Sequence, residues 1–124
     1  MVVFATVQTS KDIESSLSSY FDSVYLVSHS QNSVHAYRIG LDHFSKFIAQ
    51  RYQCTDAELV ARIRGGDLDV YKIINEFVIY TDKLGRKPAS IQIWVSAVKG
   101  YLRHLGIKIY SEDFKQMVKL PKKV

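Results

Sequence analysis

The sequence predicts an all-α protein, a compact orthogonal bundle of four core helices with one or two short helices added. Three observations support this fold class. Each long segment carries apolar residues at spacings of three and four, the period of an amphipathic helix. Residues typical of helix starts and stops stand between these segments. The chain has 124 residues, 47% of them hydrophobic, and no low-complexity linker, so one domain over 1–124 is expected.

Two helices are predicted in the first half of the chain. The first spans residues 11–25, with Ser10 as its cap and Phe21 on its apolar face. A polar break follows, and a longer helix is expected over residues 30–51. Its apolar stripe consists of Val34, Tyr37, Leu41, Phe44 and Ile48.

The second half predicts three further helices and a short last one. Thr55 and Glu58 have the spacing of a capping box, and Pro88 suits the first position of a helix. Glycines follow the apolar stripes where helices would end. At Ser111 a capping hydroxyl precedes two acids, which suit the positive end of a helix. The predicted spans are 55–66, 67–85, 88–106 and a short helix that begins at 111.

Basic residues are concentrated in the last third of the chain. Residues 1–85 carry eight Lys/Arg and ten Asp/Glu, whereas residues 86–124 carry nine Lys/Arg and two Asp/Glu. Clustered cations release condensed counterions from a phosphate backbone, so this asymmetry favours a nucleic acid as partner. The alternative is a solvated face that only keeps the protein soluble.

The single cysteine and the hydropathy pattern limit where in the cell the protein is expected. Cys54 has no disulfide partner in the chain, which suits a reducing environment. No stretch approaches the roughly 20 apolar residues that a membrane helix needs. We therefore expect a soluble, cytoplasmic protein with no membrane partner.

No motif for catalysis or for a cofactor is found. The four histidines lack metal-ligand spacing with Cys54, and no Gly-Lys-Ser/Thr follows the glycines. Several tyrosines lie on or beside apolar faces and are expected in the core. These are Tyr20, Tyr37, Tyr71 and Tyr101. The chain alone is expected to be no enzyme and to hold neither a metal nor a cofactor.

Two predicted helix starts share a pattern. Residues 30–34 and residues 87–91 each place a serine, Ser33 or Ser90, in the first helical turn. Backbone N–H groups there lack helical partners, and together with the helix dipole they favour a phosphate. Ordinary capping serines are the alternative interpretation.

The helix predicted over 88–106 carries a cationic stripe and no acid. An acid-free face with amide, hydroxyl and cationic groups can contact phosphates and base edges in a major groove. A plain solvated face, which usually mixes both charge signs, is the alternative. The stripe comprises Gln92, Ser96, Lys99 and Arg103, at positions i, i+4, i+7 and i+11.

In their order, these motifs resemble the N-terminal core-binding (SAM-like) domain of tyrosine recombinases and phage-type integrases, archaeal ones in particular. That family has a short first helix and then a helix that opens Ser-Pro-x-Thr; residues 30–37 read Ser-Gln-Asn-Ser-Val-His-Ala-Tyr. Its last core helix contains a Leu-Ser-Ala-Leu-Arg-Ser-Phe-Tyr type stretch; residues 95–102 read Val-Ser-Ala-Val-Lys-Gly-Tyr-Leu. The resemblance covers about residues 11–122.

The resemblance implies one half of a clamp on double-stranded DNA, in a site-specific recombinase that acts in DNA integration. Residues 1–10 would be a flexible start, and residues 114–124 a strap toward a C-terminal catalytic domain of the parent protein. Protomers would contact one another on the DNA. Carried over by position, the implied DNA contacts are Asn32, Ser33, His35, Arg38, Lys87, Ser90, Gln92, Ser96, Lys99, Arg103, Lys119, Lys122 and Lys123.

Two other functions remain open from the sequence. One is a helical protein-interaction module, in which Trp94 and the tyrosines anchor a partner surface. The other is a stand-alone regulator that binds DNA without recombination. Salt dependence separates protein binding from DNA binding, because DNA affinity falls steeply as salt rises.

Overall fold

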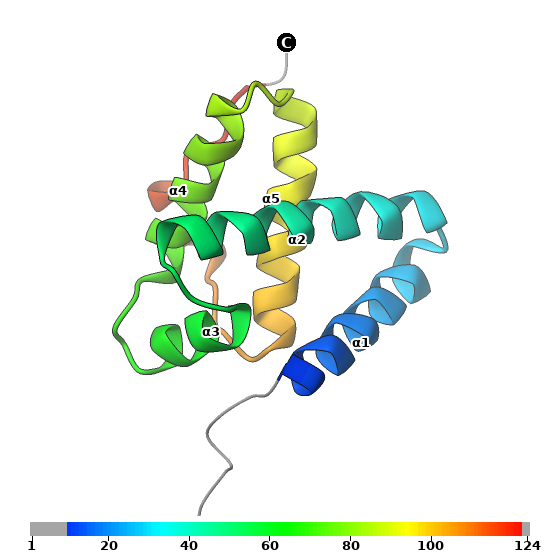
Figure 1. The fold of residues 1–124 in the computed structure, drawn as a ribbon. Coiled ribbons are helices and arrows are strands. Elements are labelled where there is room, and N and C mark those ends of the chain that lie inside the picture. The colour runs from blue at the N-terminus through cyan, green and yellow to red at the C-terminus, as the bar shows by residue number, and fades with distance from the viewer. Residues whose placement is uncertain (1–9, 123–124) are drawn as a thin grey trace, which may run out of the picture.

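The computed structural model describes residues 10–122, with side chains from residue 17 onward. This part of the chain is helical and contains no strand, which confirms the predicted all-α class (Figure 1). Its helices are α1 (Ser10–Ser28), α2 (Gln31–Arg51), α3 (Asp56–Arg64), α4 (Val70–Lys83), α5 (Pro88–His104) and α6 (Ser111–Met117). Apart from Ser10, the predicted flexible start (1–10) lies outside the described residues.

Several helix boundaries follow from local capping interactions. The Ser30 hydroxyl accepts a hydrogen bond from the Ser33 backbone N–H at 3.2 Å, and α2 begins after it. Thr55 and Glu58 form a complete capping box at the start of α3. Gly106 follows α5 with a φ of 90°, a left-handed conformation in which a Cβ would be strained. Local side-chain chemistry therefore sets where these helices start and stop.

Two helix boundaries differ from the prediction by three residues, and one predicted cap is wrong. Helix α4 begins at Val70 rather than at Asp67, because the Asp67 carboxylate accepts a 3.1 Å hydrogen bond from Arg62 and belongs to the turn after α3. Asp69 caps α4 instead, accepting from the Tyr71 N–H at 3.0 Å. Helix α1 continues to Ser28, past the predicted end at 25. The N-cap residue of α6 is Tyr110, so Ser111 is the first helical residue and not the cap.

Helix α2 lies steeply across α5, and this crossing is the centre of the bundle (Figure 1). Gly40 permits the close approach: a Cβ at this position would lie 3.0 Å from the Cα of Trp94. Beside the crossing, the Phe77 ring of α4 packs on Phe44 and Phe47 of α2, with centroids 5.2 and 5.6 Å apart. The fold therefore fixes α5 against α2 with little room for adjustment.

The chain after α5 packs back onto the bundle. Phe114 of α6 and Val118 are buried, and the Lys119 backbone N–H donates to the Asn75 side chain of α4 at 3.0 Å. Residues 114–117 are helical, so the predicted strap over 114–124 is extended only from Val118 onward in the described part. We refer to residues 107–122 as the C-terminal segment.

None of the described helices is long and apolar enough to cross a membrane.

Candidate nucleic-acid interface

Three residues of the predicted cationic stripe on α5 contact the C-terminal segment. The Gln92 amide donates to the Pro121 carbonyl at 3.0 Å, and the Arg103 guanidinium donates to the Ile109 carbonyl at 2.7 Å. The Lys99 ammonium lies 4.4 Å from the centroid of the Phe114 ring, a cation–π contact. The stripe is thus partly engaged within the domain rather than wholly free.

The fourth member, Ser96, is exposed, and Arg103 is also largely exposed despite its hydrogen bond. Lys99 is more enclosed. Its burial, together with the nearby charge of Arg103, lowers the pKa of the Lys99 ammonium. The outward part of the stripe is therefore the ridge of Ser96 and Arg103, with Lys99 at its edge.

The predicted contacts in the C-terminal segment are two exposed lysines, Lys119 and Lys122. Lys123 lies outside the described residues. The Lys119 backbone is held by Asn75, and the next residues are held by the bond from Gln92 to Pro121. The segment consequently carries its lysines across α4 and α5, beside the helix that bears the stripe.

The predicted contacts on α2 are exposed at Asn32 and His35 and half-buried at Ser33. The Arg38 guanidinium lies 4.3 Å from the centroid of the Phe21 ring, so it packs on α1. Ser30, rather than Ser33, supplies the capping hydroxyl, which favours the capping interpretation of this helix start.

The amino ends of α2 and α5 do not lie together. In Figure 1 the amino end of α2 adjoins the end of α1 at the right, whereas α5 begins at the top. At the start of α5, Lys87 is exposed and makes no side-chain capping bond, and Ser90 is half-buried. The structure therefore does not combine Ser33 and Ser90 in one phosphate cradle.

Helix α5 also separates two groups of polar residues. Gln92 and Trp94 are two positions apart, which is about 200° around a helix. Gln92 faces the C-terminal segment, while Trp94 packs on Gly40 and stacks on His43 of α2, with ring centroids 4.5 Å apart. Arg86 approaches the same indole. His43 and Arg86 are not among the residues predicted from the sequence, since only the α2–α5 crossing brings them together.

The ion pairs of the described residues all lie outside the basic third. They join Lys46 to Asp42, Arg51 to Glu76 and Arg62 to Asp67. No Lys or Arg between residues 86 and 122 pairs with a carboxylate whose side chain is described. The positive charge that the sequence concentrates there is thus not neutralised by described acids.

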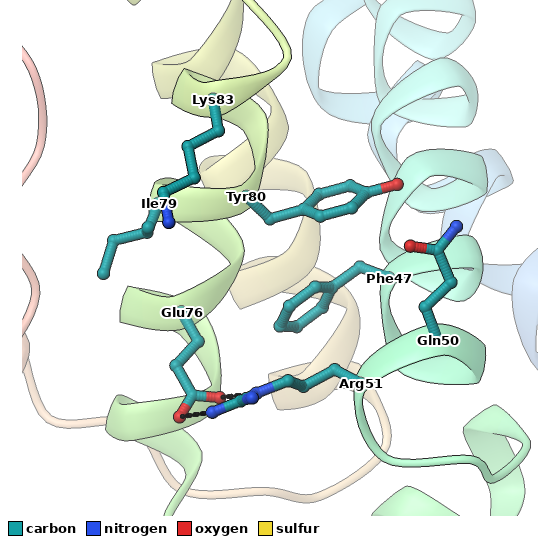
Figure 2. A pocket seen from close by; sticks show the side chains of 7 residues that line it. All are labelled: Phe47, Gln50, Arg51, Glu76, Ile79, Tyr80 and Lys83. Carbon is teal, nitrogen blue, oxygen red and sulfur yellow. Dashed lines mark hydrogen bonds and ion pairs between the residues drawn. The ribbon is translucent and has the colours of Figure 1, made fainter.

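A cleft of about 450 Å³ lies between α2 and α4 (Figure 2). Phe47, Ile79 and Tyr80 give it apolar walls, and Lys83 projects from α4 beside it. At the opposite end, the Glu76 carboxylate pairs with Arg51. The cleft combines an aromatic surface with charged groups at both ends.

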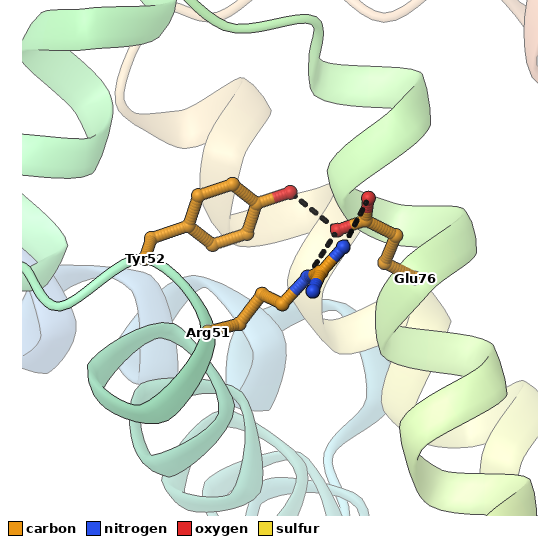
Figure 3. Close-up of polar contacts among 3 residues, drawn as sticks. All are labelled: Arg51, Tyr52 and Glu76. Carbon is orange, nitrogen blue, oxygen red and sulfur yellow. Dashed lines mark hydrogen bonds and ion pairs between the residues drawn. The ribbon is translucent and has the colours of Figure 1, made fainter.

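Figure 3 shows how Arg51 and Tyr52 converge on Glu76. Arg51 Nε lies 3.2 Å and the Tyr52 hydroxyl 2.5 Å from the same carboxylate oxygen. Burial raises the pKa of Glu76, but these hydrogen bonds outweigh it and hold the pKa below its ordinary value. Burial and the Glu76 carboxylate both raise the pKa of Tyr52. The group ties the end of α2 to α4.

The structure also shows where the predicted aromatic anchor and the predicted core tyrosines lie. Trp94 is only 8% exposed, so it cannot serve as the exposed anchor of a partner surface. Tyr20 and Tyr101 are buried, as predicted, and Tyr37 and Tyr71 are partly buried against the core. Within the described residues, no three His, Cys, Asp or Glu side chains are grouped to hold a metal ion.

No protein family, curated protein or solved structure matches this chain. The likeness to recombinase domains therefore rests on the sequence motifs alone.

Proposed function

We propose that this domain binds double-stranded DNA, as the core-binding part of a site-specific tyrosine recombinase in which a separate domain performs catalysis. The supporting observation is the basic third of the chain, whose cations make no ion pair with any described carboxylate. Cations left without carboxylate partners are available to phosphates.

The proposed contact surface follows α5 and the C-terminal segment. Ser96 and Arg103 form its ridge on α5, and Lys119 and Lys122 flank it. The Gln92 amide donates to the Pro121 carbonyl and so anchors the C-terminal segment beside this surface. The predicted contacts on α2 lie apart from this surface, and we do not include them in it.

Titration of a 20-base-pair duplex over a salt series tests DNA binding. We expect weak affinity, with a Kd of about 1–100 µM near physiological salt, and a steep decrease between about 50 and 200 mM. Replacing Lys119 and Lys122 together by alanine should reduce the slope of log affinity against log salt by about two, one for each phosphate that is no longer neutralised.

The matched control replaces Lys72 and Lys83, two exposed lysines of α4, by alanine. The control removes the same charge and should leave the slope near that of the wild type. An affinity that is indifferent to salt would exclude the proposed function, and equal losses in both variants would exclude the proposed surface.

The recombinase assignment requires a separate observation. The reading frame after Val124 should encode a catalytic domain with an arginine, a lysine, a His-x-x-Arg motif and a later tyrosine. A gene that lacks these motifs, together with salt-dependent DNA binding, would instead favour a stand-alone regulator.

The cleft between α2 and α4 favours a second candidate function, docking of a partner peptide. Its walls of Phe47, Ile79 and Tyr80 could bury apolar side chains, with Lys83 at the rim. Such a partner should bind with little dependence on salt and should lose affinity in Ile79→Asp. That variant should bind DNA like the wild type if the α5 surface is correct.

A further inference from the structure

A second cationic group lies at the crossing of α2 and α5, on the face of α5 opposite Gln92. His43 of α2 stacks on the Trp94 indole, with ring centroids 4.5 Å apart and planes 23° apart. Arg86, in the connection between α4 and α5, lies 6.0 Å from the centroid of the same ring. One buried tryptophan thus stacks on an imidazole and lies within reach of a guanidinium from another part of the sequence.

Both polar groups are accessible. Arg86 is exposed and His43 is half-buried, whereas the indole beneath them is 8% exposed. Because Gly40 lets Trp94 pack closely against α2, the indole has little freedom to move beneath the two side chains. Positioned groups of this kind lose little conformational entropy when they bind a ligand.

The local charge is positive and incompletely balanced. The charged groups that act on His43 are Arg86, Lys46 and Asp42. Asp42 forms an ion pair with Lys46 at 3.1 Å, so its charge is offset by that lysine. Arg86 makes no ion pair with a described carboxylate. An anion at this position would therefore find an available guanidinium whose charge already acts on the imidazole.

We propose that Arg86 and His43, supported by Trp94, form a second phosphate-binding site at the α2–α5 crossing. The site extends the proposed DNA-binding function and rests on it. It adds a contact that the resemblance to recombinase domains does not supply, because neither residue belongs to the matched motifs.

The proposed site should make DNA affinity depend on pH. In the free protein, burial and the charges of Arg86 and Lys46 lower the pKa of His43, so its imidazole is neutral near pH 7. A phosphate beside the ring favours the imidazolium and raises the pKa again. Binding therefore takes up a proton at His43, and acidification strengthens the contact.

The first experiment measures affinity for a 20-base-pair duplex at pH 6.0 and pH 8.0, at one salt concentration. We expect affinity to be about five- to tenfold higher at pH 6.0, since one unit of pKa difference corresponds to tenfold. His43→Gln should remove most of this ratio. His29→Asn, which removes an exposed histidine with a positive φ at the α1–α2 connection, should keep it.

The second experiment observes His43 directly by NMR, with and without the duplex. Its pKa should lie below the ordinary value in the free protein and rise when DNA is added. Arg86→Ala should raise the pKa of His43 in the free protein, because a repelling cation is removed. The same variant should weaken DNA binding and reduce the salt slope by about one.

The two proposals can fail separately. If the duplex does not bind at any pH and at low salt, the proposed function is wrong. If it binds with normal salt dependence but the ratio between pH 6.0 and 8.0 is near one, or the His43 resonance is unaffected by DNA, only the second site is excluded. The NMR titration of the wild type gives this answer even if His43→Gln fails to fold.

Discussion

Charge has different roles before and after Arg86. In the earlier part, all three ion pairs of the described residues join side chains of α2, α3, α4 and the turn after α3, and acids cap helices at Glu58 and Asp69. In the later part, the cations contact carbonyl groups and an aromatic ring or face solvent. Carboxylates pair with cations in the first part, whereas in the second part no described carboxylate pairs with a cation, which leaves its positive charge available for a partner.

The largest expected effect on DNA affinity comes from adding an acid to the basic last third of the chain. Ser96→Glu places an acid on the exposed ridge of α5, one turn from Lys99. It would neutralise one cation and repel phosphate, so DNA affinity should decrease by about tenfold or more. Thermal unfolding should change little, because Ser96 is exposed.

Ser18→Glu is the matched control, since Ser18 is an exposed serine on α1. It should leave DNA affinity within about twofold of the wild type. Equal losses in the two variants would mean that net charge alone, rather than the α5 surface, determines binding.

The Glu76 group, in the earlier part, should affect stability and not DNA binding. Glu76→Gln weakens the hydrogen bonds from Arg51 and Tyr52 that connect α2 to α4. We expect the free energy of unfolding to fall by about 1 kcal/mol. Solvent on one side of the group screens its charge and limits the effect. Urea denaturation measures it. Glu112→Gln, at an exposed acid of α6, should be within about 0.5 kcal/mol of the wild type.

The stabilisation from Glu76 should depend on pH in a defined direction. Because the pKa of Glu76 in the folded protein lies below the ordinary value of 4.5, its contribution is complete above that value and lost as pH falls through the folded-state pKa. The stability difference between wild type and Glu76→Gln should be constant above about pH 6 and shrink below pH 4.5. A difference that grew on acidification would contradict the assigned hydrogen bonds.

The smallest effect is expected at the exposed pair of Lys46 and Asp42, whose side chains are each 64% exposed. Asp42→Ala should change the free energy of unfolding by less than about 0.5 kcal/mol, as exposed pairs one helical turn apart usually do. Chemical denaturation sets this bound. A loss as large as that of Glu76→Gln would show that burial does not determine how much these charged groups stabilise the fold.

Much of the fold could be predicted because its determinants are local. The cap at Ser30, the capping box at Thr55 and Pro88 at the start of α5 each act within a few residues. The start of α4 differs from the prediction because the pairing of Asp67 with Arg62 is decided by a turn, not by helical periodicity. Periodicity does not reveal which acid will serve as the cap.

The candidate site is less predictable, because its contacts join distant segments. The spacing of Lys99 and Arg103 places them on one face, but Phe114 and the Ile109 carbonyl reach them only after the chain folds back. Phe114 and Val118, an apolar pair with helical spacing and both buried, are a signal for that return in the sequence. For Arg86 no comparable signal exists in the sequence.

The attachment of α1 has a consequence for motion. Its Tyr20 hydroxyl donates to the Ala97 carbonyl of α5 at 3.1 Å, and the ring occupies the space beside Gly100, where a Cβ would lie 3.2 Å from the Tyr20 Cζ. A single aromatic residue thus supplies much of the link between the first helix and α5. Helix α1 lies at the edge of the bundle, whereas the crossing of α2 and α5 is its centre, so the amides of α1 should exchange with solvent deuterium sooner than those of α2 and α5.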